Sequence, residues 1–301
     1  MSLGYKTRYG HKIQTLPVSI ASDCPNRRGL KGMKACIFCD EWGSAAYPEL
    51  QPLSLEEQIR RNIEVLGPKF SAQEFLVYFQ AYTSTFLDFQ KLRNHVETAL
   101  SIPRVHGFIL GTRPDTLSQA TLNLLKEKAQ SHYVSVELGV QSFSDEHLKW
   151  LERGHNAQVA IKAVEKLKGV PNLEVGIHLM FGLPSETDTH IQETARLVST
   201  LPIDHVKLHN LHVLKNTPLE ELYRRGEFQP VELDEYARRV ILFLQHLDPR
   251  IRIQRLGAVA SRWGELVAPR WTTYKMRTYQ FIIDRMNEQK AFQGEHFTPL
   301  G

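Results

Sequence analysis

At 301 residues, the chain is long enough for one large domain or two small ones. Its 37 Lys and Arg against 33 Asp and Glu leave a net charge of +4, with both ends basic: residues 1–34 carry seven Lys or Arg against one Asp, and residues 262–301 carry six against four acids. No apolar run approaches the ~20 residues that span a bilayer, and the N-terminus lacks the apolar core of a signal peptide, so we expect a cytoplasmic protein without membrane contact, whose thiols stay reduced.

The first expected elements lie on either side of the cysteines. Residues 16–22 form a short apolar run, which we interpret as a strand that leads into the first cysteine. Residues 54–66 predict a helix, because Ser54 can cap its N-terminus and apolar residues recur at helical spacing. Gly67-Pro68 predicts the end of that helix, and residues 74–82 predict a buried strand.

Strand-like and helical stretches alternate along the rest of the chain. Further strands are expected at 105–111, 133–140, 173–183, 205–213 and 251–256, and helices at 86–101, 117–130, 144–152, 157–168, 187–200 and 234–247. This alternation implies parallel βαβ units, and six or seven of them indicate an α/β fold, a full or partial (β/α) TIM-like barrel with its site at the carboxyl ends of the strands. We expect one barrel domain, residues 1–262, and a C-terminal helical extension packed on it, residues 263–301.

All three cysteines, Cys24, Cys36 and Cys39, lie in one loop after the first expected strand. Three thiolates can hold three corners of a [4Fe–4S] cluster and leave the fourth iron open to a ligand, and Gly29 and Gly32 allow the loop to wrap closely around such a core. A disulfide framework would leave an odd thiol, and simple burial does not explain why the three crowd into one loop. A structural zinc site remains the main competing interpretation, although it needs a fourth ligand from elsewhere.

Polar residues and glycines also follow the other expected strands. They occupy residues 80–85, 111–115, 139–142 and 178–184. The carboxyl ends of parallel strands meet at one rim of a barrel, so we expect this rim to collect the cysteines, the polar side chains and the glycines.

With these motifs, the sequence resembles a radical S-adenosylmethionine (SAM) enzyme of a bacterial family near the radical domain of the Elongator catalytic subunit. The Cys-x11-Cys-x2-Cys spacing is wider than the commonest first gap of that superfamily, which is three residues. The resemblance runs from about Tyr9 to Arg255 and rests on residues 79–86, 111–115, 137–142, 153–155, 182–184 and 207–215.

The resemblance implies cofactors and roles for individual residues. The three cysteines would ligate a [4Fe–4S] cluster, and the methionine part of SAM would chelate the open iron. The segment with Gln80, Tyr82, Thr83 and Ser84 occupies the place of a Gly-Gly-Glu motif that receives the methionine amino group. That motif is absent here, so hydroxyls of Thr83 and Ser84 are expected to make the contact instead.

Two further residues match the related coproporphyrinogen oxidase, in which a Gln and an Arg twelve residues apart contact the cofactor. Gln141 would hydrogen-bond the ribose, and Arg153 would hold the carboxylate and count with the cysteines among the catalytic residues. Two different interpretations stay open: Gln141 as a polar strand end, and Arg153 as a cap on the C-terminus of its own helix.

The resemblance also assigns cofactor contacts to Thr112, His178, Gly182 and Leu183. Related enzymes carry an acid where Gly111 stands and an Asp where His178 stands, so the chain departs from the pattern at both positions. Gly182 is equally suited to a tight turn, and the histidines on strands, His178 among them, are by default satisfied core imidazoles.

The chemistry of the family follows from the open iron. A reduced cluster donates one electron to the sulfonium, the bond to the adenosyl C5′ breaks, and a 5′-deoxyadenosyl radical removes hydrogen from an unactivated C–H bond. The protein contributes orientation and the exclusion of water and oxygen. An electron donor such as a flavodoxin or a ferredoxin is the implied partner.

The resemblance suggests transfer RNA (tRNA) as the substrate, because a branch of the bacterial family is associated with remodelling a wobble-uridine side chain. Two basic segments favour it: an N-terminal set for phosphates and an aromatic tail for stacked bases. They comprise Lys6, Arg8, Lys12, Arg27 and Arg28, and then Arg262, Trp263, Arg270, Trp271, Tyr274, Lys275 and Arg277. The opposing interpretation makes these aromatics core residues. Radical chemistry on a small metabolite or a protein side chain is compatible with the same motifs, and so is a zinc-stabilised nucleic-acid-binding module.

Overall fold

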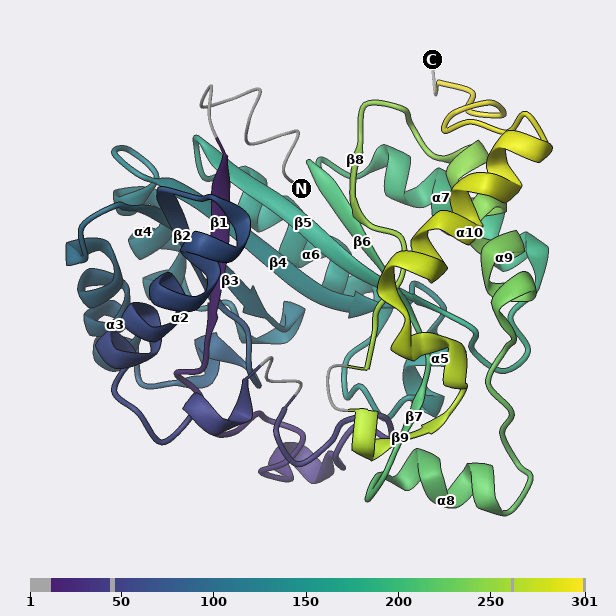
Figure 1. The fold of residues 1–301 in the computed structure, drawn as a ribbon, viewed down its shortest axis with the longest axis horizontal. Coiled ribbons are helices and arrows are strands. Elements are labelled where there is room, and N and C mark those ends of the chain that lie inside the picture. Colours follow the sequence, from purple (N-terminus) through teal and green to yellow (C-terminus); the bar gives the residue numbers. More distant parts are fainter. Residues whose placement is uncertain (1–11, 44–46, 261–262, 300–301) are drawn as a thin grey trace.

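The structure of the protein is a computed structural model, which describes residues 12–43, 47–260 and 263–299. Its centre is a curled sheet of seven parallel strands whose order in space is their order in the chain (Figure 1). The strands are β1 (Ile13–Val18), β2 (Glu74–Phe79), β3 (Val105–Thr112), β4 (Tyr133–Gln141), β5 (Leu173–Phe181), β6 (His205–Asn210) and β8 (Arg252–Arg255). The sheet is a partial barrel, as the alternation of strands and helices predicts.

Helices cover the outer face of the sheet (Figure 1). They are α2 (Leu55–Phe70), α3 (Phe89–Ser101), α4 (Gln119–Lys128), α6 (Ala157–Lys168), α7 (Asp188–Thr200) and α9 (Leu233–His246). The last long helix, α10 (Lys275–Glu288), lies against α9. None of the helices in the described ranges is both long and apolar enough to cross a lipid bilayer.

Smaller elements gather at the carboxyl ends of the strands. They are α5 (Asp145–Trp150), α8 (Pro218–Arg224) and an antiparallel pair of short strands, β7 (Val213–Leu214) and β9 (Leu266–Ala268). The sequence patterns did not predict α8. They also missed β9 and extended the strand of β6 to residue 213, into β7, because two- and three-residue strands carry no measurable periodicity. These elements add side walls to the open end of the barrel, where they lie in Figure 1.

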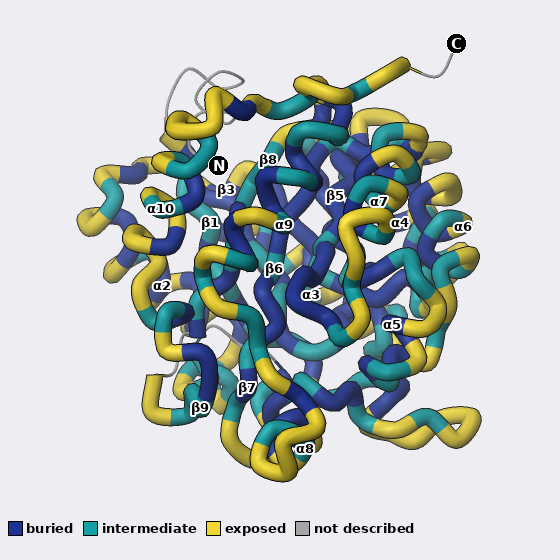
Figure 2. Tube along the Cα trace, turned by 90° about the vertical axis from the view of Figure 1, so that its right-hand side faces the viewer, coloured by how far each residue is buried: buried dark blue, intermediate teal, exposed yellow. Residues whose placement is uncertain are grey.

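The main core lies between the sheet and its helices, and Figure 2 shows the central strands, such as β5 and β6, as largely buried. The inner face of the curl is different. Toward the amino ends of the strands it holds a small apolar cluster of Ile13, Leu76, Ile109 and Tyr133. Tyr78 follows Leu76 by two residues and so points to the same face. The inside of the barrel therefore changes from apolar to polar toward the carboxyl ends of the strands.

Two predicted boundaries are wrong for identifiable reasons. Helix α2 continues through Gly67 and Pro68 to Phe70, and Ser71 at φ +50° ends it. Pro68 lacks the N–H for one helical hydrogen bond, but it lies in the last turn, so the loss falls at the end of the helix and does not divide it.

Strand β1 ends at Val18, before the predicted end at residue 22. The buried Gln58 of α2 accepts the N–H of Ser19 (2.9 Å) and donates to its carbonyl (3.1 Å), which uses both of the backbone groups that a longer strand would need.

Candidate active site

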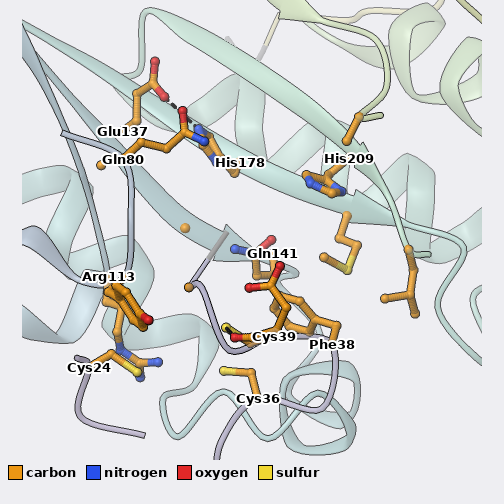
Figure 3. Close-up of a pocket in the computed structure, with 18 of the residues that line it drawn as sticks. Cys24, Cys36, Phe38, Cys39, Gln80, Arg113, Glu137, Gln141, His178 and His209 are labelled. Carbon is orange, nitrogen blue, oxygen red and sulfur yellow. Dashed lines mark hydrogen bonds and ion pairs between the residues drawn. The ribbon is translucent and has the colours of Figure 1, made fainter. Parts of the chain in front are cut away.

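A cavity of about 320 Å³ opens at the carboxyl ends of the strands (Figure 3). The cysteine loop forms one side of it, and residues of six strands form much of the rest, together with residues of the segments that follow the strands. The strand residues and those that directly follow a strand are Tyr78, Gln80, Gly111, Thr112, Glu137, Gly139, Gln141, His178, Met180, His209, Asn210 and Arg255. The predicted rim of polar residues and glycines thus surrounds one space.

The cysteine loop presents three free thiols to this cavity. The N–H of Cys39 donates to the carbonyl of Cys36 (3.0 Å), which closes a tight turn between these two ligand candidates. Asn26, almost fully buried, donates its amide to the carbonyls of Lys34 and Glu152 and so ties the loop to the segment after α5. These hydrogen bonds fix how the cysteine loop lies against the rest of the protein.

Tyr82 supports the same loop from the strand side. Its hydroxyl donates to the carbonyl of Glu41 (2.6 Å), and the Arg27 guanidinium lies over its ring at 5.5 Å. Gly43 at φ +60° packs flat on the ring, where a Cβ atom would lie only 2.4 Å from a ring carbon. Tyr82 also lines the cavity, so both support and cofactor contact are open to it.

The donor set fits an iron–sulfur cluster. Three thiols converge on one cavity, and Arg153 Nη1 lies 3.3 Å from Cys36 Sγ, where a cation stabilises a metal-bound thiolate. Burial, followed by the nearby Cys36, raises the pKa of the Cys39 thiol to about 12. Metal binding therefore has to displace a proton there, as it does at thiolate sites generally.

Arg153 is buried and belongs to the cavity wall. Its Nη2 donates to the carbonyl of Gly139 (2.6 Å), and its own carbonyl accepts a hydrogen bond from Arg113 Nη2 (2.6 Å). Arg113 is in turn paired with Asp115 at 2.8 Å. The Arg153 side chain thus bonds to Cys36 and Gly139 and not to the end of its own helix, so the helix-cap interpretation finds no support among the described residues.

Gln141 lies beside Arg153, because both side chains approach Gly139. Gln141 has φ +71°, a conformation that residues with a Cβ atom rarely adopt and that is concentrated at functional sites. Thr112 lines the cavity and shares a hydrogen bond with Thr85 (2.5 Å). Thr83 is buried and also lines the cavity, whereas Gln80 reaches toward the opposite side, near Glu137 and His178 (Figure 3).

Three predicted contact residues lie outside the cavity lining. Ser84 donates its hydroxyl to the carbonyl of Phe79 (3.3 Å). Gly182 has φ +91°, and its N–H donates to Glu186 (2.9 Å), which is the geometry of a tight turn. Leu183 packs in an apolar cluster with residues of β7 and α8.

The sequence motifs missed the most buried charge of the site, Glu137 on β4. Its carboxylate accepts hydrogen bonds from Tyr78 (2.6 Å), Lys207 (2.5 Å) and His178 (2.8 Å), each from a different strand. Burial opposes its ionisation, but the Lys207 ammonium and the hydrogen bond from His178 hold the pKa of Glu137 well below its usual range. Charged residues inside the apolar strands β4 and β6 were the available signal.

The histidines of the site are neutral. Burial lowers the pKa of His178 to about 4 despite the adjacent Glu137 carboxylate, so His178 donates its Nε2–H to that carboxylate. The stacked rings of His209 and His212 both donate Nδ1–H to the carbonyl of Asn210 (3.0 and 3.2 Å). Burial lowers the pKa of both, that of His212 to about 4.

These features agree with the comparison to known families. Residues 18–198 match the Radical SAM superfamily, and residues 203–288 match the Radical_SAM C-terminal domain. The chain belongs to the radical SAM superfamily. This family uses a [4Fe–4S] cluster and SAM, so the protein is an enzyme, and the interpretation as a zinc-stabilised binding module is wrong.

Full-length relatives occur in distant organisms. An uncharacterised protein of Methanocaldococcus jannaschii is 33% identical over 97% of this chain and 90% of its own length. Protein YhcC of Escherichia coli is 33% identical over 95% of this chain and 91% of its own length.

The chain is also similar to Elongator-type proteins, as its motifs predict. The tRNA uridine(34) acetyltransferase of Methanocaldococcus infernus is 30% identical over 73% of this chain, which corresponds to 46% of that protein. The structure of the archaeal Elp3 of Methanocaldococcus infernus, lacking its N-terminus, shares the fold with a TM-score of 0.71 at 19% identity. It aligns with 93% of this chain and 64% of that one.

Proposed function

We propose that this radical SAM enzyme acts on tRNA and remodels the side chain of a wobble uridine. The observation that carries the proposal is an aromatic and basic surface next to the cavity. Trp263, Tyr274 and Tyr279 are 68%, 59% and 48% exposed. The exposed cations Arg270, Lys275 and Arg277 lie between these rings along the chain. Exposed rings among cations are the combination that binds unpaired nucleotides.

This surface adjoins the site. Residues Ala258, Val259 and Ala260 line the cavity, and the N–H of Ala260 donates to the carbonyl of Thr272 (3.2 Å), within the aromatic segment. The segment that carries the exposed rings is therefore hydrogen-bonded to the cavity wall. The similarity to a tRNA uridine(34) acetyltransferase supports the same substrate class.

Part of the surface expected from the sequence has a structural role instead. Trp271 stacks on Tyr236, with ring centroids 5.3 Å apart, and donates its indole N–H to the carbonyl of Val231 (3.1 Å). It belongs to the core against which α10 packs, so it is not a base-stacking ring. Of the predicted phosphate contacts, Lys6, Arg8 and Arg262 lie outside the described residues.

The N-terminal cations that the structure does describe are engaged locally. Arg27 donates to the carbonyl of Asp40 and lies on Tyr82, and Arg28 pairs with Asp23. The aromatic and basic surface between Trp263 and Tyr279 is therefore a better candidate for contact with RNA than the N-terminal cations.

The proposed mechanism divides the cavity into two sides. Cys24, Cys36 and Cys39 would hold the cluster, while Arg153 would hold the methionine carboxylate of SAM and Gln141 would hydrogen-bond its ribose. When bound, the cofactors supply a carbon radical that can remove hydrogen from an unactivated C–H bond. On the opposite side, the Glu137 network fixes His178 in its neutral form, with Nδ1 left as an acceptor for a substrate group.

The test is nucleoside analysis of tRNA from cells with and without the gene. We expect one wobble-uridine derivative to disappear, its precursor to accumulate, and the native gene but not a Cys36→Ala variant to restore it. Identical nucleoside profiles would exclude tRNA as substrate and leave a metabolite or a protein side chain, with the radical chemistry unaffected.

A further inference from the structure

Arg255 ends strand β8 and lines the cavity. Its Nε–H donates to the carbonyl of Leu208 (3.2 Å), which fixes the plane of the guanidinium. Its two terminal nitrogens make no hydrogen bond or ion pair with any residue in the described ranges. The strand register sets Arg255 beside Lys207, at the depth of the Glu137 network.

The groups around Arg255 leave its charge unbalanced. Glu137 is already shared with Lys207, and the nearby imidazoles of His178, His209 and His212 are neutral. Burial lowers the pKa of Arg255, although an arginine keeps its proton in proteins. Arg255 is half-buried at the cavity wall. A partly desolvated cation without a counter-charge costs free energy, and such a cost persists where a ligand compensates it.

A second unpaired donor belongs to another residue of the same cavity wall. Asn210, at the end of β6, is fully buried and accepts the N–H of Ala258 on its Oδ1 (2.8 Å). Its Nδ2 has no partner among the described residues. Buried amide groups are nearly always hydrogen-bonded, so Asn210 and Arg255 together offer donors for an absent, negatively charged acceptor.

The acceptor does not come from the cofactor side of the cavity. The cysteines lie on one side, together with Arg153, whereas Glu137 and His178 lie on the other (Figure 3). Lys207 bonds Glu137 and pairs in register with Arg255, so Arg255 belongs to the side away from the cysteines. That is the side left for the substrate.

We propose that Arg255 and Asn210 bind a carboxylate on the part of the substrate that enters the cavity. With the function proposed above, this group is a carboxylate on the uridine side chain. The inference rests on that function only where it identifies the substrate as a uridine. A planar guanidinium pairs with a carboxylate through two parallel hydrogen bonds, and the charges of +1 and −1 match. A phosphate monoester carries close to −2 at neutral pH, for which the site has one free cation among the described residues.

The decisive experiment uses the anaerobically reconstituted protein with S-adenosylhomocysteine in place of SAM. Calorimetric titration compares a uridine with a carboxymethyl group at C5 and the methyl ester of the same compound, which differs only in the charge. We expect the wild type to bind the acid at least tenfold more tightly than the ester. Arg255→Gln should lower the affinity for the acid by about tenfold to a hundredfold and change the affinity for the ester little.

Two variants and one control sharpen the result. Arg255→Lys keeps the positive charge but lacks the paired N–H groups of a guanidinium. It should therefore keep part of the preference for the acid over the ester that Arg255→Gln loses. Asn210→Asp keeps an oxygen that accepts the N–H of Ala258, but it replaces the unpaired amide donor by a negatively charged oxygen. This variant should therefore bind the acid more weakly than the wild type does. Arg252→Gln is the control, because Arg252 lies on the same strand but is exposed and paired with Glu174.

Stability separates binding from a purely structural role. Removing an unpaired, half-buried cation should leave the melting temperature of the substrate-free Arg255→Gln protein unchanged or higher, whereas loss of a structural residue would lower it. Equal affinity for acid and ester in the wild type, or an Arg255→Gln protein that keeps the preference, overturns the proposal.

Small anions identify which proposal has failed. Arg255-dependent binding of acetate, with no binding of either nucleoside, keeps the carboxylate site and refutes the uridine substrate. Arg255-dependent binding of inorganic phosphate but not of acetate overturns the carboxylate assignment.

Discussion

At the scale of single residues, the site is held by charges that meet from distant parts of the chain. Glu137 and Lys207 are 70 residues apart in sequence, and Arg153 and Cys36 are 117 apart. The cysteines could be predicted because their chemistry and spacing are local. The partners of Glu137 could not, because adjacency of strands, and not sequence distance, brings them together.

The first prediction concerns the cysteine loop. Cys24→Ala, Cys36→Ala or Cys39→Ala should each abolish the intact [4Fe–4S] signal, because the cluster then loses one of its three protein ligands. The measurement is iron content with visible absorption after anaerobic reconstitution, where the wild type should hold about four irons per chain. A wild-type protein that takes up one zinc and no iron would contradict it.

The second prediction concerns Arg153. Arg153→Lys keeps the positive charge but loses the fork, so SAM affinity should fall by roughly tenfold while iron content stays close to that of the wild type. Equilibrium binding of labelled SAM to the reconstituted protein measures the first quantity, and iron analysis measures the second. Arg250→Lys is the control, because Arg250 is paired with Asp248 at the surface, outside the cavity lining. Unchanged SAM affinity would remove Arg153 from the cofactor site.

At the scale of elements, the sequence predicts which helices and strands exist better than it predicts where they begin and end. The seven sheet strands and the long helices all appear where hydrophobic patterning places them. Their ends depend on partners that patterning does not contain, such as Gln58, which takes both backbone groups of Ser19 and ends β1. Trp271 and Trp263 illustrate the same limit, since only the fold separates the buried ring from the exposed one.

The third prediction tests the aromatic surface. Stacking on an aromatic ring is worth ~1–3 kcal/mol per base, so Trp263→Ala and Tyr274→Ala should each weaken tRNA binding by roughly fivefold or more. Replacing Arg270, Lys275 and Arg277 together by Gln should instead flatten the salt dependence of binding, because fewer counterions are released. Filter binding at several salt concentrations measures both effects.

Trp271→Ala is the contrasting variant for this surface. Its ring packs on Tyr236, so this change should lower the melting temperature instead of acting on RNA alone. Undiminished tRNA affinity in Trp263→Ala and Tyr274→Ala proteins of normal stability would argue against a stacking surface.

At the scale of the whole molecule, a partial barrel gathers neutral imidazoles, the Glu137–Lys207 ion pair and Arg255, unpaired among the described residues, around one polar cavity. A small apolar cluster lies on the same inner face, nearer the amino ends of the strands. Buried neutral histidines link folding to pH. The pKa of an unfolded histidine is about 6.5, whereas burial lowers the pKa of His178 to about 4 in the folded protein. Between these values the unfolded state binds a proton that the folded state does not, so stability falls as the pH is lowered.

The fourth prediction follows from the direction of this pH dependence. The free energy of unfolding should decrease between pH 6.5 and 4.5, by at most about 1.4 kcal/mol per pH unit for each such imidazole. The charged groups facing His178 are Glu137, Lys207 and Arg255. The pKa of Glu137 is held well below 4.5, so the stability that it contributes is lost only at lower pH and does not obscure this window.

His178→Gln isolates the effect, because glutamine can keep a hydrogen bond to Glu137 but has no titrating nitrogen. Urea unfolding of the anaerobically reconstituted protein at pH 6.5, 5.5 and 4.5 should show a shallower pH slope for His178→Gln than for the wild type. His296→Gln, at an exposed position near the C-terminus, should leave the slope unchanged. Equal slopes for the wild type and His178→Gln would mean that His178 already carries its proton in the folded protein. The Glu137 carboxylate would then face two adjacent cations, Lys207 and His178, and the cavity wall would carry one more positive charge than the neutral imidazole provides.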